Sequence, residues 1–119
     1  AGILVVPIPG VTAIASLISV LGLNADEFTF LGFLPKKKGR QTLMNSLKNE
    51  KRPVVFYESP MRVDKTLNEL KEYLGDEKYV VIGRELTKIH EEIIRGKLGE
   101  IVDNLNKINK RGEFVICLV

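Results

Sequence analysis

The sequence predicts an α/β fold, a layered sandwich in which a mixed sheet of roughly five to six strands is flanked by about four helices. Two observations indicate this class. Short apolar, β-branched runs alternate along the chain with segments whose apolar residues recur at helical spacing. Glycine or proline stands at most of the boundaries between them. With 119 residues, 45% of them hydrophobic, the chain can bury one core, so a single domain over residues 1–119 is expected.

In the first half, the predicted order is strand, helix, strand, helix. Residues 3–6 predict a short strand that stops at the PIPG turn of residues 7–10. Thr12 offers a hydroxyl to cap a helix that Gly22 ends. Residues 28–31 predict the next strand. After a basic loop, apolar positions at helical spacing predict a helix over residues 40–49, which Pro53 closes.

In the second half, residues 54–57 and 79–83 are apolar runs typical of buried strands. The helix between them is expected to take Ser59 as its cap and Pro60 as its first residue, and to end at Gly75. Residues 93–97, 98–105 and 114–119 then predict a strand, a helix and a last strand. Because two strands flank one short helix, an antiparallel pair is expected near the C-terminus.

Composition excludes several classes of protein. No apolar run approaches the ~20 residues of a membrane span, so we expect a soluble protein without a membrane partner. Cys117 is the only cysteine, which excludes an internal disulfide, suits the cytoplasm and favours a role in the core. His90 is the only histidine, so no metal site is expected. Because the chain begins at Ala1 and enters an apolar run at once, we expect it to be part of a longer protein.

The positive charge is concentrated in one segment. Residues 36–52 hold seven basic side chains against one acidic side chain, a charge of +6, whereas the whole chain carries +3 and the remainder therefore −3. A local basic patch on a near-neutral body is typical of proteins that bind a polyanion. A solvated loop and helix face is the alternative.

Charged groups follow two of the predicted strands. Tyr57 and Glu58 end the strand at 54–57, and the segment RELTKIHEE at 84–92 follows the strand at 79–83. In open α/β sheets, ligands bind at the carboxyl ends of the strands, so these segments are candidate cleft residues. Glu58 has two interpretations, an electrostatic cap for the following helix or an acceptor for a ligand hydroxyl. His90 likewise suits either a proton shuttle or a hydrogen-bonded structural role.

Four motifs occur together in order: VPIPG at 6–10, FLGFLPKK at 30–37, VFYESPMR at 55–62 and RELTKIHEE at 84–92. Together they resemble the ribosomal RNA small subunit methyltransferase I family of the tetrapyrrole methylase superfamily, over residues 3–119. The resemblance implies S-adenosylmethionine-dependent 2′-O-methylation of a cytidine in small-subunit rRNA. It also implies that this chain is the C-terminal domain of a two-domain enzyme. The N-terminal domain, with its glycine-rich loop and Asp-Pro-Gly segment, is absent from this chain.

The resemblance also assigns roles to residues. Those implied for S-adenosylmethionine are Thr12, Ala13, Tyr57, Glu58 and Leu86. Those implied for RNA are Lys36, Lys37, Lys38, Arg40, Arg62, Arg84 and Lys88. Glu85 and His90 are the candidate catalytic bases. Since the donor lies between two domains in this superfamily, we expect the chain alone to be inactive and the full-length protein to be a homodimer.

Two other functions fit the same sequence. An anionic tetrapyrrole would also bind a basic loop, so a domain of a corrin or porphyrin C-methyltransferase is one alternative. A non-catalytic dimerisation module is the other, and it would expose an apolar face.

Overall fold

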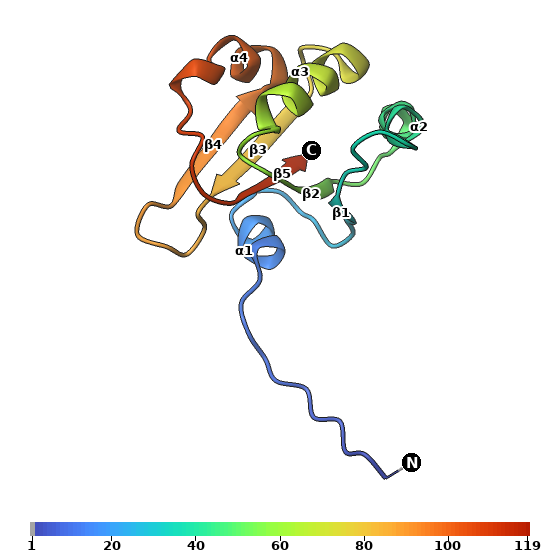
Figure 1. Ribbon diagram of the computed structural model, residues 1–119, viewed down its shortest axis with the longest axis vertical. Helices are drawn as coiled ribbons and strands as arrows, with labels where there is room; N and C mark the ends of the chain where they lie inside the picture. The colour runs from blue at the N-terminus through green and yellow to red at the C-terminus, as the bar shows by residue number, and fades with distance from the viewer. Residues whose placement is uncertain (1) are drawn as a thin grey trace.

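The computed structural model describes residues 2–119, which form a five-stranded sheet and four α-helices (Figure 1). The strands are β1 (Thr29–Phe33), β2 (Val54–Glu58), β3 (Tyr79–Arg84), β4 (Glu92–Lys97) and β5 (Phe114–Leu118). The helices are α1 (Ala13–Ser19), α2 (Arg40–Ser46), α3 (Val63–Leu74) and α4 (Leu98–Asp103), and 3₁₀ turns follow at Leu47–Asn49 and Leu105–Lys107. The predicted α/β class, with a mixed sheet and four helices, is confirmed.

The sheet order is β1-β2-β5-β3-β4. β1 pairs parallel with β2, and the remaining pairs are antiparallel. β1, β2 and β3 therefore run in one direction and end at the same edge of the sheet, where β5 begins. The two strands that flank α4 pair with β3 and not with each other, because α4 carries the chain across the sheet. Antiparallel pairs do form near the C-terminus, β3 with β4 and β3 with β5, but the two strands that flank α4 run parallel to each other.

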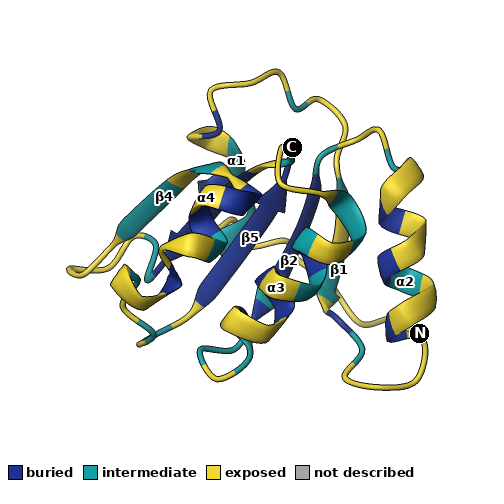
Figure 2. Cartoon of the chain, turned by 90° about the horizontal axis from the view of Figure 1, so that it is seen from above, coloured by how far each residue is buried: buried dark blue, intermediate teal, exposed yellow. Residues whose placement is uncertain are grey.

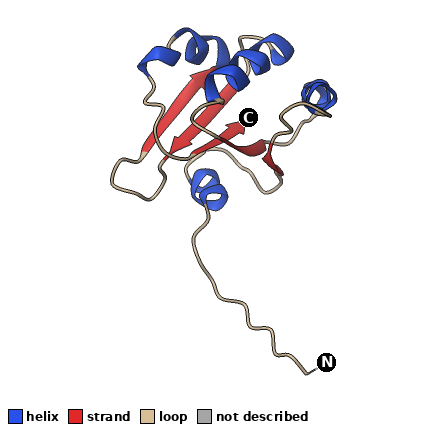
Figure 3. Ribbon diagram, in the orientation of Figure 1, coloured by secondary structure: helices blue, strands red, loops and turns tan. Residues whose placement is uncertain are grey.

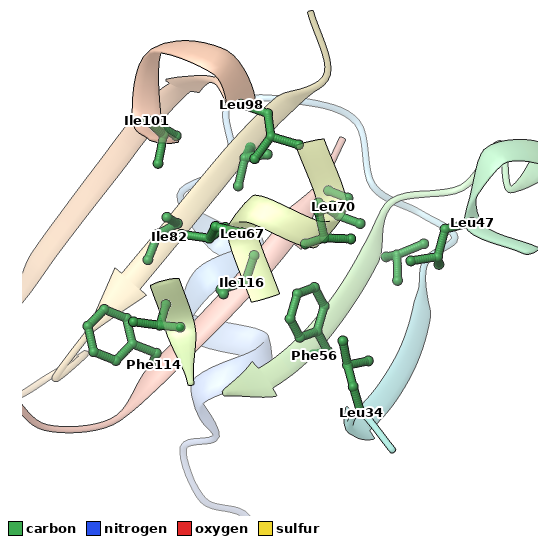
Figure 4. Close-up of a cluster of buried hydrophobic side chains, with 14 of the residues drawn as sticks. Leu34, Leu47, Phe56, Leu67, Leu70, Ile82, Leu98, Ile101, Phe114 and Ile116 are labelled. Carbon is green, nitrogen blue, oxygen red and sulfur yellow. The ribbon is translucent and has the colours of Figure 1, made fainter. Parts of the chain in front are cut away.

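The two faces of the sheet are covered unequally (Figure 3). α3 and α4 lie on one face, over a core that includes Phe56, Ile82 and Ile116 (Figure 4). The short helix α1 lies on the other face, where Leu17 packs against Val55, Val81 and Cys117. Figure 2 shows β5 buried along its whole length while the outer faces of the helices are exposed.

Cys117 lies in the middle of β5 and is fully buried. This agrees with its predicted place in the core. Burial raises the pKa of the Cys117 thiol to about 11, because an apolar interior disfavours the thiolate.

The strand predicted at residues 3–6 is wrong. Residues 2–12 form an extended arm that points away from the body (Figure 1), and its apolar side chains are exposed, Leu4 by 86%. β-Strands need a hydrogen-bonded neighbour, and the arm has none among the described residues. Residues 3–6 have the amino-acid composition of a strand but lack, within residues 2–119, the partner strand that would make them one.

The predicted helix ends are partly confirmed. Thr12 caps α1, since its hydroxyl accepts a hydrogen bond from the Ala15 amide at 3.1 Å. Gly75 ends α3 with a left-handed φ of 86°. The predicted start at Ser59 and Pro60 is wrong, because these residues form a turn in which the Ser59 carbonyl accepts from the amides of Arg62 and Val63. The α-helix starts at Val63.

Candidate functional site

A pocket of about 470 Å³ lies at the edge of the sheet where β1, β2 and β3 end and β5 begins. This is the edge at which the sequence predicts a ligand site. Four of the five residues predicted to contact the methyl donor line it together: Ala13, Tyr57, Glu58 and Leu86. They come from α1, β2 and the loop after β3, so the fold brings together residues up to 73 positions apart.

Thr12 does not line this pocket. Its hydroxyl is engaged in capping α1, and its side chain borders a neighbouring hollow that α1 forms with Phe28 and Phe30. The capping bond nevertheless fixes the first turn of α1, which carries Ala13 to the pocket. Thr12 is therefore a structural neighbour of the site.

Glu58 is held by a buried polar network. Its carboxylate accepts a hydrogen bond of 2.6 Å from the Thr66 hydroxyl and one of 2.8 Å from the Ser59 amide. The Thr66 hydroxyl in turn accepts from the Arg40 guanidinium at 2.9 Å. Both interpretations of Glu58 have support, because it binds the backbone just before α3 and also borders the pocket.

Arg40 belongs to this buried network and is not part of the exposed basic loop. It is only 6% exposed, it pairs with Glu69 at 2.8 Å, and it donates to the Pro35 carbonyl at 2.9 Å. A guanidinium that is buried and bonded in this way is unable to reach RNA phosphate. The expectation that Arg40 contacts RNA is thus corrected to a role in fixing the base of the loop.

Hydrogen bonds and ion pairs of charged side chains hold the loop between β3 and β4 in place. Lys88 donates to Glu85 at 2.9 Å and to Glu113 at 3.2 Å, and the Thr87 amide donates to Glu91 at 2.8 Å. Glu85 and Thr87 adopt left-handed backbone angles, φ 50° and 65°, which cost non-glycine residues about 1–2 kcal/mol each. Strained backbone of this kind concentrates at functional sites.

The surroundings of Glu85 do not suit a general base. The hydrogen bond from Lys88 holds the pKa of the Glu85 carboxyl below its ordinary value. A general base works best with a pKa near the operating pH, so this shift is in the wrong direction. His90 is exposed in the same loop, and neither residue lines the pocket.

Arg84 is a second predicted RNA residue that the structure places inside. It is 7% exposed and donates to Glu92, to the Arg111 carbonyl and to the His90 carbonyl, at 3.0 to 3.2 Å. These bonds join β3 and β4 to the turn before β5. Arg84 therefore holds the loop in place, and the expectation of a direct RNA contact is corrected.

The remaining basic candidates lie at the surface. Lys36, Lys37 and Lys38 are exposed in the loop between β1 and α2, directly after the strand end that borders the pocket. Arg62 is half-buried at the start of α3, and Lys88 is exposed but paired with carboxylates. The lysine loop is thus the part of the predicted RNA surface with the most accessible charge.

Sequence reasoning missed two parts of the pocket wall. Phe33, at the end of β1, and residues 112–115, at the start of β5, also line it. The glycine at position 112 was a usable signal in the sequence. The structure shows why glycine is needed there: φ is 88°, and an added Cβ would lie 2.4 Å from the Glu85 side chain. Only glycine lets these two segments approach so closely.

Within residues 2–119, no cluster of three histidine, cysteine or acidic side chains is placed to hold a metal ion. In the same range, no helix is long and apolar enough to cross a membrane.

The family model and the curated relatives that match this sequence point to the same family. The sequence matches the family described as Tetrapyrrole (Corrin/Porphyrin) Methylases over residues 1–102. A relative from Thermotoga maritima named ribosomal RNA small subunit methyltransferase I is 43% identical over 98% of this chain and 52% of its own length. The chain spans about half the length, 40–52%, of three curated relatives that it matches.

Solved structures show the same fold at low sequence identity. A cobalt precorrin-4 methyltransferase superposes with a TM-score of 0.66 at 14% identity, over 92% of this chain and 50% of that one. A Thermus thermophilus uroporphyrin-III C-methyltransferase, solved with S-adenosylhomocysteine, gives 0.57 at 21% identity, over 92% and 50%. The chain belongs to the tetrapyrrole methylase family, and its resemblance to ribosomal RNA small subunit methyltransferase I is confirmed.

Proposed function

We propose that this chain is the C-terminal half of an S-adenosylmethionine-dependent methyltransferase that acts on small-subunit rRNA. The observation that carries the proposal is the pocket at the carboxyl ends of β1 and β2, where Ala13, Tyr57, Glu58 and Leu86 converge. The chain spans about half of its rRNA methyltransferase relatives, which agrees with a site completed by a second domain.

The pocket suits a molecule with an apolar and a polar part. Tyr57 and Leu86 offer apolar surface to a planar base and a thioether, and Glu58 borders the pocket with carboxylate oxygens able to accept from ribose hydroxyls. S-Adenosylmethionine has these features and supplies the methyl group to the reaction.

For the acceptor we propose the 2′-hydroxyl of a cytidine, as the resemblance implies. The donor would transfer its methyl to the 2′ oxygen and leave as S-adenosylhomocysteine, while the hydroxyl proton would pass to a base, so the hydroxyl must be held in line with that methyl and near that base. Glu85 and His90 remain candidates for the base only if the loop between β3 and β4 rearranges in the complete enzyme. We place the lysine loop of residues 36–38 against RNA phosphate.

We also propose that the complete protein contains a second domain that packs on this one, that it is a homodimer, and that it acts in the cytoplasm, where rRNA is modified. The exposed arm and the unequally covered sheet support a further contact on the α1 face.

A tetrapyrrole methyltransferase is the second candidate, because solved enzymes of that class share the fold. Their identity to this chain is 14–21%, against 43% for the rRNA methyltransferase of Thermotoga maritima. Sequence identity therefore favours RNA. Competition between a short rRNA helix and a porphyrin precursor for the chain distinguishes the two.

The main experiment is calorimetric titration of S-adenosylmethionine into this chain and into a fusion of this chain behind the N-terminal half of the Thermotoga maritima relative. Methyl transfer to small-subunit rRNA is then measured for both. We expect binding and transfer by the fusion only. Tight binding and transfer by the chain alone would contradict the split site, and a folded fusion that binds no donor would contradict the proposed function.

A further inference from the structure

We propose that the Phe33 ring is a stacking platform for an unpaired base of the RNA substrate, next to the phosphate-binding lysine loop. The inference rests on the proposed function and adds the form of RNA that the site takes. Three separate observations support it: how the backbone aims the ring, how exposed the ring is, and which charges follow it.

A β-bulge aims Phe33 toward the pocket. In a regular strand, residues 30, 32 and 34 share one face and Phe33 points to the other. In β1 the register shifts between Phe30 and Phe33, and Gly32 between them has φ 65°. As a result both rings contact Tyr57, with centroid distances of 5.4 and 5.5 Å. Bulges that redirect a side chain occur often beside active sites.

The redirected ring remains 68% exposed although it borders the pocket. Tyr57 meets it tilted, at 51°, and so supports the ring from one side. The neighbouring Leu31 and Leu34 point the other way and pack with the core under α3. Because of the bulge, the Phe33 ring is exposed while the leucines on either side of it are packed in the core.

The charges next to the ring favour nucleic acid over an apolar partner. Lys36, Lys37 and Lys38 begin three residues after Phe33, and all are exposed. Proteins that bind single-stranded nucleic acid combine basic side chains along the backbone with aromatic rings on which bases stack. A base in a duplex is already stacked on its neighbours, so the platform selects an unpaired one.

The test compares RNA binding by this chain and by Phe33→Leu, with a dye-labelled single strand and with a duplex of the same sequence. Stacking on an aromatic ring contributes roughly 5- to 100-fold per base, so Phe33→Leu should weaken single-strand binding by that factor. Duplex binding should change less than twofold. Phe33→Tyr keeps an aromatic ring and should restore the single-strand affinity.

Two further variants serve as controls. Phe28→Leu changes another partly exposed phenylalanine, outside the pocket, and should leave both affinities unchanged. Replacing Lys36, Lys37 and Lys38 by alanine should weaken both RNAs and reduce the salt slope by about 2, whereas Phe33→Leu should leave that slope unchanged.

The outcomes separate the inference from the proposed function. Equal effects of Phe33→Leu on single strand and duplex, or none on either, would overturn the stacking platform. If the triple lysine variant still loses affinity in that case, the RNA surface stands without the platform. A triple lysine variant with unchanged affinity and salt slope would contradict the RNA surface itself.

Discussion

Thr66 shows how one hydroxyl joins two parts of the molecule. It donates to Glu58 and accepts from Arg40, so the pocket wall and the base of the lysine loop share a single oxygen atom. Within the described chain, no buried side-chain polar atom lacks a partner. A fully bonded buried network is rigid, and removing its central member leaves two charged groups short of a partner.

Thr66→Val should therefore destabilise the protein by about 2–4 kcal/mol, because valine keeps the shape but removes the bonds to Arg40 and Glu58. Urea unfolding measures this loss. Thr66→Ser is the matched control, since it keeps the hydroxyl and should cost only about 1 kcal/mol. Equal loss in both variants would show that the methyl group, and not the network, provides the stability.

The carboxyl of Glu85 makes the loop between β3 and β4 sensitive to acid. Its pKa is lowered in the folded state by the hydrogen bond from Lys88. A lowered pKa gives stability that is present above the ordinary value of 4.5 and is lost as the pH falls through the folded value. Amide exchange protection of residues 85–91 should thus be constant down to about pH 4.5 and should fall as the pH drops further.

Glu85→Gln provides the comparison, because an amide does not titrate. In that variant the protection of residues 85–91 should already be reduced at pH 6 and should depend less on pH. The same pH dependence in the variant and in the parent chain would assign the effect to other carboxyls of the loop.

At the scale of the element, β1 depends on the backbone of Gly32. A left-handed φ of 65° costs any other residue about 1–2 kcal/mol, so Gly32→Ala should lower the free energy of unfolding by that amount. The loss should come with a weaker contact between Phe33 and Tyr57, which proton NOEs between the two rings detect. Gly10→Ala, in the arm, has open space and no left-handed φ and should change neither quantity.

The elements that could be predicted from sequence are those whose signals are local. Strands β2, β3 and β5 are runs buried on both faces, and Gly75 marks where α3 ends, whereas α1 ends at Ser19, three residues before the predicted Gly22. Residues 3–6 have the same composition as such a strand, but pairing depends on a partner strand, which the local sequence does not report. The bulge in β1 was missed for a similar reason. Gly32 permits a bulge, but whether one forms depends on how β1 pairs with β2.

The wall of the pocket was predictable where one strand end or one motif contains it. Tyr57 and Glu58 are the last two residues of β2, and Leu86 lies two residues after the end of β3. The burial of Arg40 and Arg84 was not predictable, because their partners lie far away in sequence. Glu69 is 29 positions from Arg40, and the Arg111 carbonyl is 27 positions from Arg84. Charge patterns do not distinguish an arginine in solvent from one that is buried and paired.

At the scale of the whole molecule, the arm of residues 2–12 contributes little to the stability of this chain. Its apolar side chains are exposed, Ile3 by 83% and Ile8 by 88%. Removing the chain up to Val11, which keeps the capping Thr12, should change the free energy of unfolding by less than about 0.5 kcal/mol. Urea unfolding of the shortened chain measures this.

The same deletion should behave differently in the fusion protein. If the arm packs against the second domain, its removal there should reduce both stability and donor binding. A loss of more than about 1 kcal/mol in the isolated chain would instead show that the arm packs on its own body in solution.

The position of Cys117 makes the chain a reporter of its own opening. β5 is hydrogen-bonded on both sides, to β2 and to β3, so fraying of an edge strand does not expose the sulfur. The raised pKa, about 11, also keeps the folded thiol protonated at neutral pH. The sulfur lies under α1, against Leu17 and Leu21, so reaction with a thiol reagent requires α1 to leave the sheet or the whole chain to unfold. Because the sequence has no other cysteine, the rate of that reaction measures how often the α1 face of the sheet opens.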